Sequence, residues 1–457
     1  MNTKQFTLNP KVVNMIDDLK KQFPDGLIVS DVIDDKGHQY VDLVQEGGGT
    51  WGIALLGYTH VLEQMGIRFL NLGGTSAGAI NTLLMASCDK PEAPKSAKIL
   101  EILANKNLRD FEDGDKDAKN IVKALLSKAG GLKLLFKIFQ VKDNFKRDMG
   151  LNPGNAFHDW LTEKLDGFGV QDTEDLAQRM NDLPDDIRFR PDRKDLNGVE
   201  IKSRMAVIAT EINTETKIEF PKMAGLFYDD VDRVNPTNYV RASMSIPVFY
   251  KPYTIENLPH NEESIIKWKE IARHEGGPPE RAVLVDGGVV SNFPIDVFHR
   301  KKGLPSRPTF GVKLGLERNS NHNVNSTTKL LLRCFSAARN LRDLEFIHNN
   351  PDYDKLVAYV DTGTHNWIDF NLSKEAKIEL FEEGAKAAVD FLMKFDWNAY
   401  KGIRANNFKK ICGGTPQNIG RDHSIVSDNM LTDDTSKYLY AENDMLKELG
   451  IKVSGRV

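Results

Sequence analysis

The clearest hydrophobic pattern of this chain consists of two short apolar runs near the N-terminus. Each run is followed by a glycine-rich turn and then by a stretch with helical spacing of apolar residues. The runs are Val41–Val44 and Ile67–Leu72. Short apolar runs of this kind predict buried strands, and the spacing after each turn predicts a helix. Residues 41–88 therefore form one predicted βαβ unit with a second helix. In open α/β sheets ligands lie at the carboxyl ends of the strands, so both glycine turns are candidate site loops.

The remaining pattern predicts helices and strands over the rest of the chain. Helical spacing begins in residues 1–39 and continues at about 95–104, 118–128, 132–141, 155–165, 239–245, 326–349, 373–395 and 441–449. Strands are predicted at 205–212 and 217–220, paired as a hairpin, and at 282–285, 308–314 and 356–360. The run Ala282–Val285 is continuously apolar, which suits a buried parallel strand. A proline at the first helical position predicts a helix after Pro294.

Composition and charge narrow the class of protein. The chain is 40% hydrophobic and 28% charged, with a formal net charge of −4. A sizeable core is expected, and no field of one sign indicates a nucleic-acid partner. Three widely spaced cysteines form neither a metal pattern nor a disulfide framework, which favours a reducing compartment. Without an apolar leader or a run long enough to span a bilayer, a cytoplasmic location is expected.

The second glycine turn, Gly74-Thr75-Ser76-Ala77-Gly78, matches the G-x-S-x-G pattern of a nucleophile elbow. In such an elbow a serine occupies a strained turn between a strand and a helix, so that its hydroxyl projects outward. The residues two before and two after approach each other closely, and only small residues fit there. The predicted strand before and helix after supply the required context. The alternative is a glycine-rich helix start that Ser76 caps.

The first glycine turn, Gly47-Gly48-Gly49, exposes successive backbone N–H groups at the positive end of a predicted helix. This is the chemistry of an oxyanion hole. Gly47, Gly49 and Gly52 also satisfy the dinucleotide pattern G-x-G-x-x-G, which expects an acidic residue at the end of the second strand. The second strand ends in Leu72–Thr75 without an acid, so a nucleotide cofactor is disfavoured.

A third candidate, Asp286-Gly287-Gly288, follows the apolar run that ends at Val285. A serine hydroxyl is a weak nucleophile unless a base accepts its proton, and an aspartate at a strand end can supply that base. Taken alone, the sequence Asp-Gly is more often an ordinary turn. Its interest lies in its combination with the two glycine loops.

In combination these three motifs resemble the patatin-like phospholipases. The stretch Arg241–Pro247 and the sequence Asn292-Phe293-Pro294 add to the resemblance, which covers about residues 40–315. The resemblance implies a Ser–Asp dyad with Ser76 as nucleophile and Asp286 as base. It implies that Gly47, Gly48 and Gly49 donate to the oxyanion, that Gly74, Thr75, Ala77 and Gly78 shape the elbow, and that Gly287 and Gly288 support the aspartate. It implies neither a metal nor a cofactor.

One position departs from the family pattern, which usually has Arg or Lys where this chain has Trp51. Backbone donors are unaffected, whereas a role of that cation in gripping an anionic head group is in doubt. A histidine triad of Ser76, Asp286 and His299 or His365 is the alternative, but that fold requires several strands before its serine. His60 is expected to be a packed or surface residue.

The resemblance implies a three-layer α/β/α fold with a mostly parallel central sheet. The expected divisions are an N-terminal helical segment (1–39), a catalytic domain (40–315) and a C-terminal helical region packed on it (316–457). The catalytic domain would include a helical cap (about 90–200) and a polar insertion (about 260–281). The basic amphipathic stretch Lys133–Arg147 is expected to pack on the core as part of the cap, with transient contact to a membrane surface as the alternative.

The expected function is hydrolysis of fatty-acyl esters of glycerolipids, as in a phospholipase A or lysophospholipase, through an acyl-enzyme. The expected partner is the lipid substrate, and the sequence does not fix the oligomeric state. Two alternatives remain open. One is a lipid-binding or regulatory protein with a degenerate site, and the other is acyl transfer to an acceptor other than water.

Overall fold

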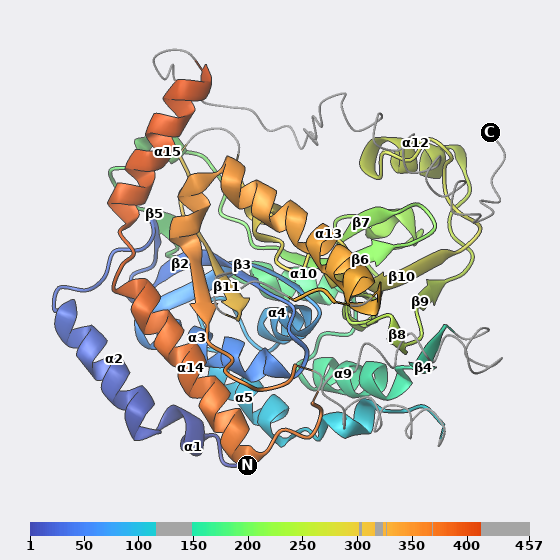
Figure 1. Ribbon diagram of the computed structural model, residues 1–457. Helices are drawn as coiled ribbons and strands as arrows, with labels where there is room; N and C mark the ends of the chain where they lie inside the picture. Colours follow the sequence, from blue (N-terminus) through green and yellow to red (C-terminus); the bar gives the residue numbers. More distant parts are fainter. Residues whose placement is uncertain (116–148, 301–303, 316–322, 326, 368, 413–457) are drawn as a thin grey trace. The chain divides into compact units, whose positions relative to one another are not determined.

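A ten-stranded sheet forms the centre of the computed structural model, which describes residues 1–115, 149–300, 304–315, 323–325, 327–367 and 369–412 (Figure 1). All of these residues lie in one compact unit, Met1–Thr415. The order of neighbouring strands is β12-β11-β2-β3-β6-β10-β9, with β1 beside β2, β5 beside β1, and β7 beside β6. The ten strands are β1 (Val32–Ile33), β2 (Gln39–Gln45), β3 (Ile67–Thr75), β5 (Arg188–Phe189), β6 (Met205–Glu211), β7 (Thr216–Phe220), β9 (Tyr253–Ile255), β10 (Ala282–Asp286), β11 (Thr309–Leu314) and β12 (Val357–Val360). A separate pair joins β4 (Gly150–Asn152) to β8 (Val248–Tyr250).

The central strands β12, β11, β2, β3 and β6 run parallel to one another. The α/β class with a mostly parallel central sheet is therefore confirmed. The predicted hairpin is also confirmed, because β6 and β7 pair antiparallel. The prediction of a parallel strand at 282–285 was wrong, since β10 is antiparallel to both β6 and β9. Every residue of β10 is buried, but burial on both faces does not fix the direction of a strand.

Helices cover the sheet, and every residue of β3 and β6 is buried. The α-helices are α1 (Lys4–Thr7), α2 (Pro10–Gln22), α3 (Gly52–Gln64), α4 (Ala77–Ser87), α5 (Ser96–Asn105), α9 (Asn155–Gly167), α10 (Thr173–Asn181), α11 (Thr237–Ser243), α12 (Glu262–Ile271), α13 (Thr327–Asn349), α14 (Lys374–Leu392) and α15 (Trp397–Cys412). Short 3-10 helices are η1 (Gly49–Trp51), η2 (Leu108–Phe111), η3 (Lys194–Leu196), η4 (Ala224–Leu226), η5 (Gly287–Val289), η6 (Ile295–Phe298) and η7 (Pro351–Leu356).

Helix α14 packs directly on α3, the helix that follows the first glycine loop. Two glycines make this contact close. A β carbon on Gly57 would collide with the carbonyl of Phe381, and one on Gly384 would collide with the carbonyl of Ala54. Because both positions lack a side chain, the two helix backbones touch. The C-terminal helix α14 therefore belongs to the same core as the helix that follows the first glycine loop.

Two predicted segments differ from the structure. The chain after Pro294 forms only the four-residue 3-10 helix η6. Its buried residues Ile295 and Phe298 lie against Gly311 and Gly73 of the sheet, which holds the segment to a single turn. The polar insertion contains α12, which begins after the capping side chain of Asn261. The helices predicted at 118–128, 132–141 and 441–449, and the amphipathic stretch Lys133–Arg147, lie outside the described residues.

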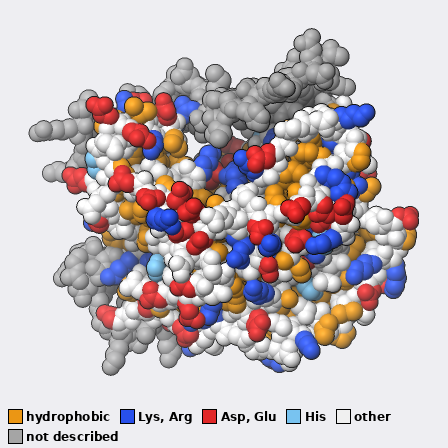
Figure 2. Space-filling model, turned by 180° about the vertical axis from the view of Figure 1, so that it is seen from behind, with side chains coloured by type: hydrophobic (Ala, Val, Ile, Leu, Met, Phe, Trp, Pro, Cys, Tyr) orange, Lys and Arg blue, Asp and Glu red, His pale blue; other side chains and the backbone are white. Residues whose placement is uncertain are grey.

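The surface of the described residues carries both signs of charge. Figure 2 shows acidic and basic side chains interspersed on one face, with hydrophobic side chains scattered among them. Among the described helices, none is long and apolar enough to cross a bilayer. The same residues contain no group of three or more His, Cys, Asp or Glu side chains that could hold a metal ion.

Candidate active site

Ser76 occupies the sharp turn between β3 and α4. Its backbone has φ 53° and ψ −119°, a conformation that costs a residue with a side chain on the order of 1–3 kcal/mol. The residue is 7% exposed, and its N–H donates to Ser243 Oγ at 3.0 Å. It also stands at the N-terminus of α4, where the helix dipole favours negative charge. This is the backbone of a nucleophile elbow rather than of an ordinary helix cap, and the Ser76 side chain makes no capping hydrogen bond.

The glycines of the elbow are required by close approach. A β carbon on Gly74 would lie 2.5 Å from the carbonyl carbon and oxygen of Gly78 and 2.8 Å from Thr82 Oγ1. A β carbon on Gly78 would lie 2.9 Å from the carbonyl oxygen of Glu46. Thr75 and Ala77, on either side of the serine, are also buried. The elbow thus presses against the end of β2, directly before the first glycine loop.

The first glycine loop lies against the serine. A β carbon on Gly47 would be 3.1 Å from Ser76 Cβ. The N–H of Gly47 donates to the carbonyl of Asn292 at 3.0 Å, so this group is already bonded. Within the described part of the chain, the N–H groups of Gly48 and Gly49 have no hydrogen-bond acceptor. Of the three expected oxyanion donors, Gly48 and Gly49 are therefore available, while Gly47 ties the loop to residue 292.

The far side of this loop is held by a segment from the C-terminal region. The N–H of Thr50 donates to the carbonyl of Trp367 at 2.8 Å, and Thr50 Oγ1 donates to the same carbonyl at 3.2 Å. Gly49 has φ 55°, and a β carbon there would collide with that carbonyl. Only glycine combines this left-handed backbone with so close an approach. Residue 367 therefore helps to set the direction of the Gly48 and Gly49 N–H groups.

The pairing of β6 brings Asp286 next to Ser76. One edge of β6 pairs with β7 over residues 207–211. Its other edge pairs first with β3, where Thr75 lies opposite Ile208, and then with β10, where Asp286 lies opposite Ala209. Strands β3 and β10 therefore meet end to end, with their carboxyl ends facing each other. Because successive residues of a strand are about 3.3 Å apart, Thr75 and Asp286 are immediate neighbours along this edge.

Two glycines follow Asp286 and complete this junction. The side chain of Asp286 accepts a hydrogen bond from the N–H of Gly288 at 2.7 Å, which orients the carboxylate and starts η5. A β carbon on Gly287 would collide with the carbonyl of Ile208 and would lie 3.0 Å from Thr75 Cγ2. Asp286 itself is 7% exposed. The Asp-Gly-Gly sequence thus serves both to aim the carboxylate and to let the two strand ends touch.

The end of α11 contacts both candidate catalytic residues. Ser243 Oγ accepts the N–H of Ser76, and the carbonyl of Ser245 accepts the N–H of Asp286 at 2.9 Å. Arg241 holds this segment in place, because its buried guanidinium donates to Ser245 Oγ and to the carbonyls of Pro153 and Lys251. Burial lowers the pKa of Arg241. Through Arg241 this segment connects the chain at Pro153 and Lys251 to the junction of β3 and β10.

The loop after η5 connects the site to α13. Asn292 Nδ2 donates to the carbonyl of Gly47 at 3.0 Å, so that residues 292 and 47 exchange two hydrogen bonds. Asp343 on α13 fixes this loop by accepting from Ser291 Oγ at 2.9 Å and from the N–H of Phe293 at 3.0 Å. Burial raises the pKa of Asp343 to about 6. Asp343 is therefore a positioning residue for the glycine loop.

The histidines considered from the sequence have other partners. His299 Nδ1 lies 2.8 Å from Tyr353 Oη and packs edge-on against Phe346. His365 Nε2 lies 3.1 Å from Glu379 Oε2. His60 is buried in α3, and this burial lowers its pKa to about 4. These contacts favour the dyad over a histidine triad.

Trp51, where the family pattern breaks, ends η1 directly after the glycine loop. Its side chain is half-buried and packs against the hydrophobic core. Its buried Nε1 has no hydrogen-bond partner among the described residues. The indole therefore contributes packing here, and it supplies no positive charge for an anionic head group.

Four residues that contact the site were given no role from the sequence: Ser243, Asn292, Asp343 and Trp367. Ser243 and Asn292 lie in stretches that had been noticed for their resemblance to the family, and each adjoins a motif. Asp343 and Trp367 carried no signal, because nothing local marks a residue that reaches the site from a distant helix or loop.

The chain is similar to known proteins in sequence and in fold. The model of the family described as "Patatin-like phospholipase" matches residues 43–299. The uncharacterized protein YqhO of Bacillus subtilis (strain 168) is 26% identical over 360 residues, which cover 78% of this chain and all of that protein. A crystal structure of VipD from Legionella pneumophila is 14% identical with a TM-score of 0.36, and the alignment covers 80% of this chain and 70% of that one.

Proposed function

The chain belongs to the patatin-like phospholipase family, since the match to residues 43–299 spans more than half of it, and we propose that it hydrolyses fatty-acyl esters of glycerolipids with Ser76 and Asp286 as a catalytic dyad. The family acts on lipid esters. The particular residues, the phospholipase A or lysophospholipase type of cleavage, and a cytoplasmic or membrane-peripheral location belong to the proposal.

The proposed reaction has two halves. Ser76 Oγ attacks the ester carbonyl while the Asp286 carboxylate takes the hydroxyl proton. The N–H groups of Gly48 and Gly49 donate to the tetrahedral oxyanion. Collapse breaks the ester bond, and the departing alcohol takes the proton from Asp286. Asp286 then deprotonates a water molecule, which attacks the acyl-enzyme carbonyl. When the ester bond to Ser76 breaks, Asp286 returns this proton to Ser76 Oγ and the fatty acid is released.

The observation that carries the proposal is the register on β6. Thr75 and Asp286 lie opposite the successive residues Ile208 and Ala209. A nucleophile elbow and an aspartate that are far apart in the chain thus become neighbours without an intervening histidine. The strained backbone of Ser76 supports the same conclusion, because such strain concentrates at functional sites.

The test is covalent labelling by a fluorophosphonate, which reacts with an activated serine. Wild-type protein should be labelled and Ser76→Ala should not, whereas the control Ser264→Ala, at the start of α12, should label like wild type. Asp286→Asn should label and hydrolyse at least 100-fold more slowly, within the range for loss of a general base. Hydrolysis that persists unchanged in Asp286→Asn would exclude the dyad.

The same experiment separates the alternative functions. If no fluorophosphonate label appears while lipid vesicles still bind, the protein is a lipid-binding protein and the hydrolase proposal fails. If added lysolipids or alcohols become acylated in place of free fatty acid being released, the site performs acyl transfer. Product profiling of a mixed-lipid panel, comparing wild type with Ser76→Ala, would then identify the acyl donor.

A further inference from the structure

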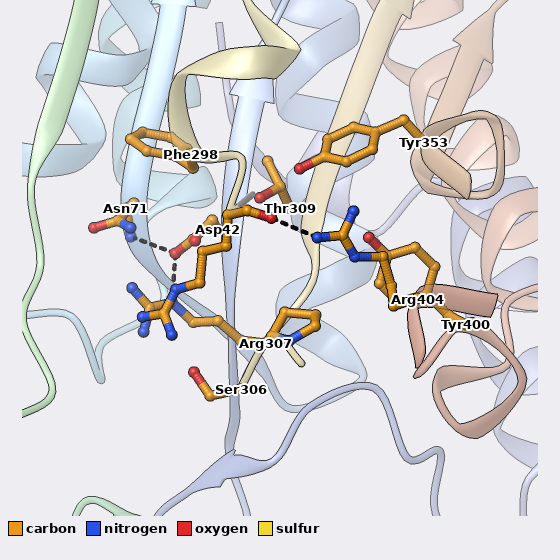
Figure 3. Close-up of a pocket in the computed structure, with 11 residues that line it drawn as sticks. Asp42, Asn71, Phe298, Ser306, Arg307, Thr309, Tyr353, Tyr400 and Arg404 are labelled. Carbon is orange, nitrogen blue, oxygen red and sulfur yellow. Dashed lines mark hydrogen bonds and ion pairs between the residues drawn. The ribbon is translucent and has the colours of Figure 1, made fainter. Parts of the chain in front are cut away.

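A cavity of about 50 Å³ lies at the start of β11. Its walls include Asp42, Arg300, Ser306, Arg307, Thr309 and Arg404 (Figure 3). Thr309, the first residue of β11, pairs with Asp42, whereas Leu314, the last, contacts Gly48 of the glycine loop. At about 3.3 Å per residue, the five steps along β11 place the cavity roughly 16 Å from that loop. It is therefore separate from the candidate active site.

Positive charge exceeds negative charge in this cavity. Arg307 pairs with Asp42 at 2.6 Å, and Arg404 pairs with Asp352 at 3.2 Å. Arg300 also lines the cavity, where the carboxylate of Asp42 acts on its charge. Desolvation lowers the pKa of Arg300, and the neighbouring positive charge of Arg307 acts in the same direction. Three guanidinium groups and one carboxylate, that of Asp42, therefore line the cavity, with Arg300 reaching it from an exposed position.

A hydrogen-bond donor in the cavity also lacks an acceptor. Arg404 uses its two terminal nitrogens for Asp352 and for the carbonyl of Arg300, but its Nε is buried without a partner among the described residues. The side chain of Arg404 is 10% exposed. The buried residues Ser306 and Thr309 add two hydroxyl groups to the cavity lining. Buried donors of this kind normally have partners, so an acceptor with several oxygens fits this set.

We propose that this cavity binds a phosphate-type oxyanion, either inorganic phosphate or a phosphomonoester. Arg300 and Arg307 would neutralise its charge, with Arg404 Nε and the Ser306 and Thr309 hydroxyls as further donors. Guanidinium groups bind tetrahedral oxyanions through paired, charge-assisted hydrogen bonds. A volume of about 50 Å³ is room for about four water-sized groups, which matches four oxygens around one phosphorus. The anion would join the start of β11 to α15.

Isothermal titration calorimetry and thermal unfolding of the full chain test this inference. Inorganic phosphate should bind wild-type protein and raise its melting temperature. Arg300→Gln should weaken binding at least tenfold. Because Arg300 is exposed, this variant should fold, which an unchanged melting temperature without phosphate would verify. The matched control is Arg281→Gln, which removes the same charge from an exposed arginine on the loop before β10.

Two further titrations identify the source of the anion. Glycerol 3-phosphate represents soluble phosphomonoesters, and phosphatidylcholine vesicles containing phosphatidic acid represent a lipid head group. The site is supported if Arg300→Gln loses binding of glycerol 3-phosphate or of the phosphatidic acid vesicles while Arg281→Gln binds like wild type. The probe whose binding is lost then identifies the source of the anion. The inference is overturned if wild-type protein binds none of the three probes, or if both arginine variants bind them equally well. Inorganic phosphate and glycerol 3-phosphate carry no acyl ester, so their binding does not report on Ser76. The vesicle titrations use proteins that also carry Ser76→Ala, so that this arm too is independent of the proposed hydrolase activity.

Discussion

Replacement of Gly78 by alanine would test whether close packing of α4 on β2 sets the position of Ser76. A β carbon on Gly78 lies 2.7 Å from the carbonyl carbon of Gln45 and 2.9 Å from the carbonyl oxygen of Glu46. Since heavy atoms in contact are about 3.5–4.0 Å apart, α4 must move by roughly 1 Å. The obstructing atoms are backbone, so no side chain can rotate away to make room.

The expected effect has a stability part and a kinetic part. Overpacking of this size costs about 1–3 kcal/mol, which should appear as a lower urea midpoint. A shift of about 1 Å at a reacting group costs on the order of 100-fold in rate, which should appear in the rate constant for fluorophosphonate labelling of Ser76.

The control is Gly52→Ala at the start of α3, on the other glycine loop. There the nearest atoms to a new β carbon are at 3.9 and 4.0 Å, and the backbone φ is −52°. Alanine should stabilise the protein by about 0.4–1 kcal/mol and leave the labelling rate near wild type. If Gly78→Ala labels and unfolds like Gly52→Ala, close contact between α4 and β2 does not position the nucleophile.

Three further predictions concern residues that hold the site or the core. Because burial raises the pKa of Asp343 to about 6, its contribution to stability is present below about pH 4 and is lost as the pH rises through 6. In Asp343→Asn this pH-dependent part of the free energy of unfolding, up to about 3 kcal/mol, should be absent. Urea unfolding between pH 4 and 7.5 measures it, and a pH profile identical to that of wild type would contradict the prediction. Arg241→Lys should slow labelling of Ser76 about tenfold, because an ammonium cannot replace the fork that bonds to Ser245 and two carbonyls; labelling at the wild-type rate would dismiss that role. Trp397→Phe removes the hydrogen bond from Nε1 to Asp31. The free energy of unfolding in urea should fall by about 1.5–3 kcal/mol. A smaller loss would contradict this and would mean that the ion pairs of Arg193 and Lys401 satisfy the buried Asp31 carboxylate without the indole.

The parts of the site that are determined locally could be predicted from the sequence. A tight strand-to-helix turn needs small residues around Ser76, and the close approach of Gly74 to Gly78 is the physical reason. The glycine loop before α3 is local in the same sense. The parallel strands around β3 followed from short apolar runs alternating with helical spacing. These features depend on residues that are near one another in the chain.

Features that depend on distant contacts could not be predicted. Strand β10 shares one edge of β6 with β3 and runs antiparallel to β6. An apolar run in the sequence gives no information on the direction of the strand. Burial of Asp343 on α13 and the carbonyl of Trp367 at Gly49 arise from segments that the motifs do not include. The engaged N–H of Gly47 is another example, because its acceptor, Asn292, lies far along the chain.

The bond between Thr50 and Trp367 has a consequence for the length of a working enzyme. A protein shortened to end at residue 315 would retain Ser76, Asp286 and the whole stretch that matches the family model. It would lose the carbonyl that fixes Gly49 and the helix that fits against Gly57. We therefore expect such a fragment to be less stable and, if the proposed activity holds, slower. The smallest unit that could be exchanged between proteins with its function intact therefore extends well past the three sequence motifs.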